Sequence, residues 1–261
     1  MALPKKVFGL LLALLLPASG IAQFVSTFDA VGSAWTVNRY APAGFNSVSF
    51  LGDNRLQLTI SSADSAANRL LVNSSSFYDI QGREHAVSLP NRWTLSSQLY
   101  VASAFNTTTG TLASGGVWGV TGAAYMTFGF TNESPSDAYN AAAVDRTFRF
   151  RVANVTTGAW IDLSLPNGFT FDAWHTISAT STGSAFEYHL DGQIVATQSV
   201  AGNTALTSIQ IQGYNYGQAG SYSAFWDNVS ATAIPEPATT VAVAALAALG
   251  FALWRRRRPG K

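Results

Sequence analysis

Apolar and polar residues alternate with a period of two along most of residues 23–233, and no stretch sustains the helical period. Such alternation is typical of β-strands that bury one face. The clearest runs are 56–60, 93–101, 148–152 and 209–212. From this pattern we expect Phe148, Phe150 and Trp174 to lie in the core.

Turn residues separate these runs at intervals of about 8–14 residues, which is typical of sandwiches and jelly rolls. Asp191-Gly192 between two alternating segments predicts a β-hairpin. Glycines that we expect at further turns are Gly110, Gly115-Gly116, Gly158, Gly168, Gly183 and Gly202. With no internal repeat, the sequence predicts an all-β domain at 23–233, a single antiparallel β-sandwich of the jelly-roll type.

The composition excludes several classes of protein. Hydrophobic residues make up 48% and charged residues only 11%, so the chain is not of the disordered class. There is no cysteine, which excludes disulfide scaffolds, thiolate metal sites and cysteine nucleophiles.

The formal net charge of +1 hides an uneven distribution. Residues 23–233 contain eight arginines, no lysine and thirteen acidic residues, so this part has a charge of 8 − 13 = −5. The remaining positive charges lie in the two end segments. The sequence therefore predicts no nucleic-acid partner, which would require a basic face.

The first 22 residues have the pattern of a signal peptide. Lys5 and Lys6 precede an apolar run at 7–16, and the small residues Gly20 and Ala22 mark a cleavage site. The mature chain would then begin at Gln23. The alternative is an uncleaved membrane anchor, for which the apolar run is short.

Residues 234–261 contain three parts in order: Pro235-Glu236-Pro237, an uncharged apolar segment at 238–254, and four arginines at 255–258. The apolar segment is just long enough for a transmembrane helix. Arginines beside such a helix stay in the cytoplasm, so residues 23–233 would lie across the inner membrane.

This tail resembles the PEP-CTERM sorting signal of Gram-negative bacteria. The resemblance implies recognition by an exosortase, a membrane protease or transpeptidase, followed by removal of the tail. The protein would pass to the cell surface or the extracellular polysaccharide matrix. The residues that carry the resemblance are Pro235, Glu236, Pro237, Arg255, Arg256, Arg257 and Arg258. The alternative, a plain tail-anchored periplasmic protein, gives no reason for the tripeptide.

Residues 171–231 resemble the concanavalin A-like lectin and glucanase sandwiches, including laminin G-like modules. The resemblance rests on a Trp174-His175 strand, a hairpin at 187–192 and a closing strand at 225–229. It implies a fold that often binds glycans, but a fold alone does not decide function.

Catalytic motifs are absent from the sequence. Glucanases of this fold carry Glu-x-Asp-x-x-Glu on one strand, and none of Glu84, Glu133, Glu187 and Glu236 begins that pattern. A Gly-x-Ser-x-Gly nucleophile elbow is also absent. We therefore assign no catalytic residue.

No metal site or cofactor is expected either. The Asp-x-Asp-x-Asp pattern of calcium loops is absent. Some lectins of this fold bind calcium through scattered side chains, and Asp137, Asn140, Asp227 and Asn228 are the candidates for that alternative.

Arg149 and Arg151 are the first candidates for glycan binding. Both point away from Phe148 and Phe150, on the opposite face of one predicted strand. Guanidinium groups match carboxylates, so the pair could clamp an acidic sugar. The alternative is an ion-paired surface with Glu187 or Asp162 opposite.

Aromatic residues give four further candidates, because exposed rings can stack on sugars. Trp118 and Trp160 lie in short polar surroundings, and Tyr214 and Tyr216 lie in a glycine-flanked segment expected to be a loop. The alternative for each is packing in a half-buried loop.

Three hypotheses of function follow. The first is an exported surface or matrix protein that binds or organises extracellular polysaccharide without catalysis. The second is a glycan hydrolase with atypical carboxylates, and the third is a structural matrix protein with no specific ligand. Exposed aromatic side chains on one concave face would favour the first, and two carboxylates within glycosidase distance in a cleft would favour the second. A closed sandwich with no groove would favour the third.

Overall fold

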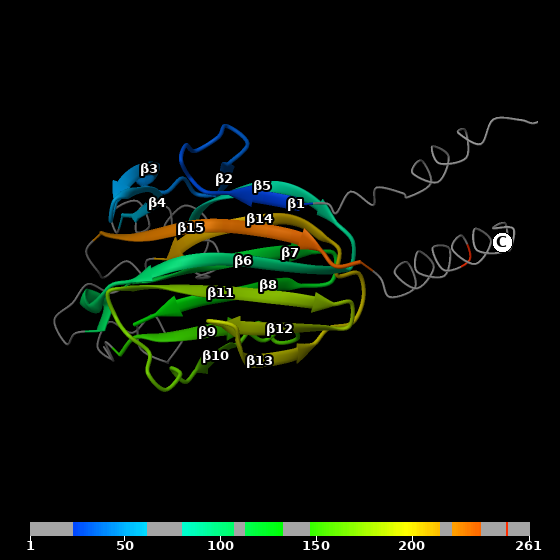
Figure 1. The fold of residues 1–261 in the computed structure, drawn as a ribbon. Helices are drawn as coiled ribbons and strands as arrows, with labels where there is room; N and C mark the ends of the chain where they lie inside the picture. Colours follow the sequence, from blue (N-terminus) through cyan, green and yellow to red (C-terminus); the bar gives the residue numbers. More distant parts are fainter. Residues whose placement is uncertain are drawn as a thin grey trace, which may run out of the picture. The chain divides into compact units, whose positions relative to one another are not determined.

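The computed structural model describes residues 23–61, 80–106, 113–132, 147–214, 221–235 and Leu249. Gln23–Ala233 forms one compact unit, to which residues 1–22 and 234–261 do not belong. As predicted, this unit is all-β, and two antiparallel sheets form a sandwich (Figure 1). The described residues include no helix long and apolar enough to cross a membrane. The expected signal peptide and, apart from Leu249, the expected helix at 238–254 lie outside the described residues.

Sheet A contains eight strands in the order β13-β12-β11-β6-β15-β4-β3, with β1 paired to β15. A short 3-10 turn, η2 (Ser103–Asn106), follows β6. The strands of sheet A are β1 (Gln23–Ser26), β3 (Gly44–Phe50), β4 (Asp53–Ile60), β6 (Arg92–Val101), β11 (Ala173–Thr182), β12 (Ala185–Leu190), β13 (Gln193–Ser199) and β15 (Tyr222–Ala233).

Sheet B contains seven strands in the order β10-β9-β8-β7-β14-β5-β2. They are β2 (Thr36–Arg39), β5 (Ile80–Leu89), β7 (Ser114–Thr121), β8 (Tyr125–Thr131), β9 (Arg149–Ala153), β10 (Trp160–Leu163) and β14 (Leu206–Tyr214). The two sheets lie face to face, with β14, β7, β8 and β9 behind β15, β6 and β11 in the view of Figure 1.

The last two strands of the unit take central places. β15 lies between β6 and β4 in sheet A, and β14 lies between β7 and β5 in sheet B. β1 pairs with β15 so that Gln23 is opposite Thr232. The two ends of the unit therefore lie side by side.

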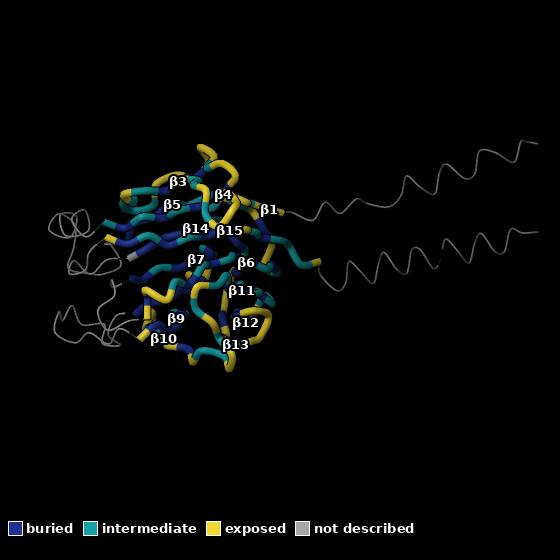
Figure 2. The backbone as a smooth tube through the Cα atoms, turned by 60° about the vertical axis from the view of Figure 1, so that its left-hand side comes forward, coloured by how far each residue is buried: buried dark blue, intermediate teal, exposed yellow. Residues whose placement is uncertain are grey.

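The core lies between the sheets, where the inward positions of the strands are buried (Figure 2). Phe148 and Phe150 are fully buried there, which confirms that prediction. The prediction for Trp174 is wrong. On β11 the inward positions are His175, Ile177 and alternate residues beyond, so Trp174 is half-buried on the outer face of sheet A.

The hairpin predicted at Asp191-Gly192 joins β12 to β13, and both turn residues have positive φ, 48° and 80°. Asp191 also reaches back to β11. Its carboxylate lies 2.7 Å from Nδ1 of His175 and accepts a hydrogen bond of 2.8 Å from the Thr176 amide. The Trp-His strand and the hairpin, seen separately in the sequence, are thus bonded to each other.

Glycine positions test the turn predictions. Gly158, Gly168, Gly183 and Gly202 have positive φ and lie in turns, as predicted. Gly115-Gly116 is not a turn, because it lies inside β7. Gly110 lies outside the described residues.

Candidate functional site

One row of residues crosses the outer face of sheet B, with one residue from each strand. The pairing register places these seven side by side in the order Asp162, Arg151, Gly129, Gly116, Gln212, Gly82 and Asn38. Three of them are glycines, which have no side chain above the sheet. We call this row the glycine row, and its three glycines are buried.

Larger residues do not fit at the glycine positions of this row. A Cβ atom on Gly116 would lie 2.6 Å from the carbonyl oxygen of Phe128, and one on Gly129 would lie 2.5 Å from that of Gly115. Both distances are far below van der Waals contact. Glycine is therefore required here by the close approach of neighbouring backbones.

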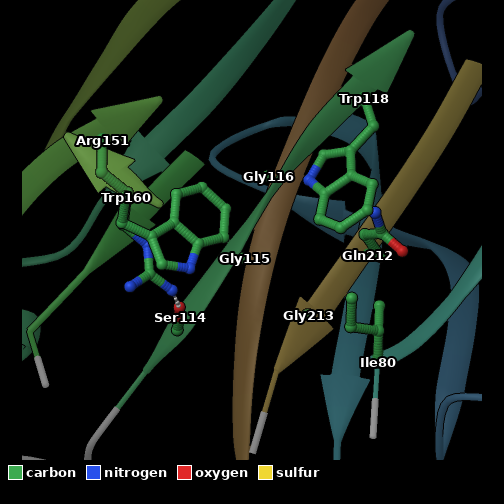
Figure 3. A pocket seen from close by; sticks show the side chains of 9 residues that line it. All are labelled: Ile80, Ser114, Gly115, Gly116, Trp118, Arg151, Trp160, Gln212 and Gly213. Atoms are coloured by element: carbon green, nitrogen blue, oxygen red, sulfur yellow. Dashed lines mark hydrogen bonds between the residues drawn. The ribbon is translucent and has the colours of Figure 1, made fainter. Parts of the chain in front are cut away.

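A small pocket lies over the middle of the row (Figure 3). Its side chains come from β7, β9, β10, β14 and β5, and they are Ser114, Trp118, Arg151, Trp160, Gln212 and Ile80. The pocket volume is about 20 Å³, enough for about one water-sized group. We call this the sheet B pocket.

Two tryptophans stand on either side of the glycine backbone, as Figure 3 shows. Trp160 is half-buried, whereas Trp118 is only 7% exposed. The indole of Trp118 contacts Tyr125 edge to face and lies 5.4 Å from the Arg39 guanidinium. Trp160 is thus the more accessible aromatic surface, and neither tryptophan lies in a loop.

Arg151 lies beneath Trp160. Its guanidinium carbon is 4.0 Å from the centre of the Trp160 ring, and its Nη2 donates a hydrogen bond of 2.7 Å to Oγ of Ser114. Only 6% of Arg151 is exposed, and its Nε has no hydrogen-bond partner. Among the described residues no carboxylate pairs with Arg151.

Arg149 differs from Arg151 although it lies on the same face of β9. Its Nε is 2.7 Å from Oδ2 of Asp162, so the ion-pair alternative holds for Arg149 with this partner. Glu187, the other expected partner, lies on β12 in sheet A. Arg149 is therefore ion-paired, whereas Arg151 has no counter-ion among the described residues.

Two glutamines on β14 were not among the site residues expected from the sequence. Gln212 accepts a hydrogen bond of 3.1 Å from Arg39 through Oε1, and Gln210 donates one of 3.2 Å to Glu84. Both side chains are buried, and Gln212 Nε2 and Gln210 Oε1 have no partner. The available signal was the alternation of 209–212, which places both amides on the face opposite the core.

The tyrosine candidates are only partly placed. Tyr214 is the last residue of β14 and pairs with Ser114 and Ile80, so its backbone is not in a loop. Its side chain and all of Tyr216 lie outside the described residues.

The strands of sheet B contain only two acidic residues, Glu84 on β5 and Asp162 on β10. Five strand steps separate β5 from β10, so at about 4.8 Å a step the two carboxylates lie about 24 Å apart. Glycosidases place their two carboxylates about 5–10 Å apart.

The calcium candidates are only partly placed. Asp137 and Asn140 lie outside the described residues. The described residues contain no group of three or more His, Cys, Asp or Glu that could hold a metal. Asp227 is 1% exposed, and its Oδ2 lies 2.9 Å from Nη1 of Arg55 and 3.0 Å from Nδ2 of Asn228. Burial raises the pKa of Asp227, while the Asn228 backbone hydrogen bond and Arg55 oppose this. A guanidinium thus already supplies the positive charge beside Asp227.

Asp227 is therefore expected to contribute no calcium-dependent rise to the melting temperature of residues 23–233. The measurement is thermal unfolding in calcium chloride and in chelator, for the wild type and Asp227→Asn. A calcium-dependent rise in Tm that disappears in Asp227→Asn would contradict this prediction. A rise that persists would come from residues outside the described ones.

A second hollow, of about 370 Å³, lies at one end of sheet A. Its lining is mainly apolar and includes Phe50, Tyr100 and Phe225, whose rings pack on one another. It contains no charged side chain. The sheet B pocket is the stronger candidate because it combines aromatic, charged and amide groups.

The sequence profile of the PEP-CTERM protein-sorting motif matches residues 233–258. The chain carries a PEP-CTERM sorting motif. The match covers the residues Pro235, Glu236, Pro237, Arg255, Arg256, Arg257 and Arg258. A PEP-CTERM motif implies an exported protein that an exosortase processes and that is sorted to the cell surface.

Solved structures resemble the body of this PEP-CTERM protein in fold. A mixed-linkage glucan GH16 protein of Bacteroides ovatus, in complex with a product, is 12% identical with a TM-score of 0.53, covering 80% of this chain and 98% of the other. The PL7 alginate lyase AlyA1 of Zobellia galactanivorans is 14% identical with a TM-score of 0.48, covering 76% and 94%. A sialidase is 11% identical with a TM-score of 0.49, and the match covers 81% of this chain but only 18% of the sialidase chain.

The GH16 protein, with its TM-score of 0.53, is a concanavalin A-like β-sandwich, so the resemblance seen in the sequence is confirmed for the fold. No curated protein matches the PEP-CTERM chain in sequence. At such low identity the likeness concerns the fold alone, and the functional argument rests on the residues of the sheet B pocket.

Proposed function

We propose that this protein is an exported, non-catalytic polysaccharide-binding protein whose ligand occupies the outer face of sheet B. The observation that carries the proposal is the sheet B pocket. There Trp160, Trp118, Arg151 and Gln212 gather around Gly116. Four of the six glycan-binding candidates from the sequence, Trp118, Arg149, Arg151 and Trp160, lie on this one face.

The chemistry of the pocket suits a sugar chain. A pyranose ring has an apolar face, which packs against an indole such as Trp160, and a rim of hydroxyls. The Nε2 atom of Gln212, buried without a partner, can donate to such a hydroxyl. Since the glycine row crosses the strands, a polymer would lie across the sheet and meet several strands at once.

The placement of acidic residues supports a non-catalytic role. The separation of about 24 Å between Glu84 and Asp162 is too large for a pair of glycosidase carboxylates. A hydrolase with atypical carboxylates stays the second candidate, because acidic residues also occur in segments outside the described ones. A structural protein without a ligand is the third, and the presence of the pocket disfavours it.

The sorting motif agrees with such a ligand. A protein delivered to the cell surface meets extracellular polysaccharide, which would be its partner there. Before processing, the tail would anchor it in the inner membrane of a Gram-negative bacterium through residues 238–254. Removal of the tail by the exosortase would release it to the surface or the matrix.

Replacing Trp160 with alanine is expected to weaken polysaccharide binding about ten-fold, because the sugar loses its most accessible stacking surface. The test uses residues 23–233, which form a compact unit of their own. A panel of neutral and acidic polysaccharides is titrated by calorimetry, and release of reducing sugar is followed in parallel.

Trp174→Ala is the matched control, since Trp174 is a half-buried tryptophan on the outer face of sheet A. It should leave binding unchanged. Absence of binding by the wild type to every polysaccharide would reject the proposal. Release of sugar would reject its non-catalytic part in favour of the hydrolase.

A further inference from the structure

We propose that Arg151 forms a subsite for the carboxylate of an acidic sugar, so that the sheet B pocket selects polyuronates over neutral glycans. The inference rests on the proposed function, because it specifies the class of polysaccharide that the pocket binds.

The first observation is a buried positive charge for which the described part of the chain provides no counter-ion. Arg151 is 94% buried, that is 100 − 6, and no described carboxylate pairs with it. Arginine does not lose its proton in proteins, so the charge cannot be avoided by deprotonation. Burial of an unpaired ion is unfavourable by several kcal/mol. An anionic ligand would supply the missing partner.

Arg149 provides the internal comparison. It lies two residues away on the same face of β9, and Asp162 neutralises it through a contact of 2.7 Å. Asp162 is opposite Arg151 in the pairing register, yet its carboxylate contacts Arg149 instead. The arrangement of β9 and β10 thus leaves Arg151 directed at the pocket.

The second observation is the size and floor of the pocket. Its volume of about 20 Å³ is too small for a sugar ring, but a single carboxylate oxygen at the edge of a bound sugar is of the size that it holds. Gly116 lines the pocket without a side chain, and Ser114 and Trp160 hold the guanidinium of Arg151 in place. A ring lying along Trp160 could lower its carboxylate into this space.

The overall charge separates this subsite from a general attraction of polyanions. Residues 23–233 contain thirteen acidic residues, eight arginines and no lysine. Such a surface repels an anionic polymer at long range. Recognition of a polyuronate must therefore come from a local contact, for which the planar fork of arginine is suited. We favour a carboxylate over a sulfate ester because the planar guanidinium matches the planar carboxylate.

The test compares polygalacturonate with its methyl ester, which has the same backbone without the charge. Residues 23–233 are titrated with both polymers and with dextran sulfate. We expect the wild type to bind polygalacturonate at least about ten-fold more tightly than the methyl ester, as one charged hydrogen-bonded contact provides. Arg151→Gln should abolish this preference, and Arg151→Lys should retain only part of it.

Arg92→Gln is the control for net charge, since Arg92 lies on β6 in sheet A, away from the pocket. It should keep the full preference. Circular dichroism checks that each variant is folded. If Arg151→Gln does not fold, the comparison of acid and ester on the wild type still decides.

The outcomes separate the two proposals. Equal binding of polygalacturonate and its methyl ester would overturn the carboxylate subsite and leave the proposed function intact. Binding of dextran sulfate but not polygalacturonate, lost in Arg151→Gln, would replace the carboxylate with a sulfate ester. No binding of any polymer, neutral glycans included, would overturn the proposed function and the subsite together.

Discussion

Trp93→Ala is expected to lower the free energy of unfolding of residues 23–233 by about 3–5 kcal/mol. Trp93 is 0% exposed and packs against Phe186, with the ring centres 5.8 Å apart. Its indole nitrogen donates a hydrogen bond of 2.7 Å to the carbonyl oxygen of Thr204. The substitution removes the buried ring and leaves that carbonyl without its partner. Urea denaturation followed by circular dichroism measures the change.

Trp174→Ala should lower the same free energy by only about 1 kcal/mol, because Trp174 is half-buried on the outer face of sheet A. Domains of this kind are stable by about 5–15 kcal/mol, so the two variants are readily distinguished. Equal destabilisation by the two substitutions would contradict the placement of Trp174 outside the core.

The second large effect is expected at the β12–β13 hairpin, where Asp191→Ala should lower the free energy of unfolding by about 2–3 kcal/mol. The carboxylate of Asp191 bonds His175, which is 5% exposed, and the Thr176 amide. Alanine removes both contacts. It also fits poorly at a φ of 48°, a conformation that aspartate and asparagine tolerate better.

Asp191→Asn is the matched variant, since it keeps the turn preference and an acceptor oxygen but loses the charge. Asp191→Asn should lower the free energy of unfolding by roughly half as much as Asp191→Ala in the same urea experiment. If the two variants were equally destabilised, the charged contact with His175 would account for the whole effect. No destabilisation by alanine would contradict the link between β11 and the hairpin.

Much of the fold could be predicted because each strand buries one face. The alternation at 148–152 alone placed Phe148 and Phe150 in the core and both arginines opposite. Trp174 shows that the size of an apolar side chain does not by itself predict its burial. Burial on β11 follows the parity of Ile177, and Trp174 has the other parity, so its large apolar ring lies outside the core.

The candidate site was harder to predict, because its parts meet only through pairing register. Trp118 and Trp160 lie on β7 and β10, and nothing local indicates that they line one pocket. Gly115-Gly116 reads as a turn in sequence, yet the close approach of β7 and β8 is what requires glycine at Gly116. Asp162 pairs with Arg149 and not with Arg151. This preference depends on side-chain geometry, which the spacing of the residues in the sequence does not encode.

The central position of the last two strands has a consequence for export. A chain that crosses the membrane from its N-terminus lacks the middle of both sheets until β14 and β15 emerge. Without them sheet B is divided into β10-β9-β8-β7 and β5-β2, and β1 has no partner at all. Such long-range pairing makes folding slow and late. We therefore expect the body to stay unfolded during translocation and to fold only as the adjoining sorting motif reaches the membrane.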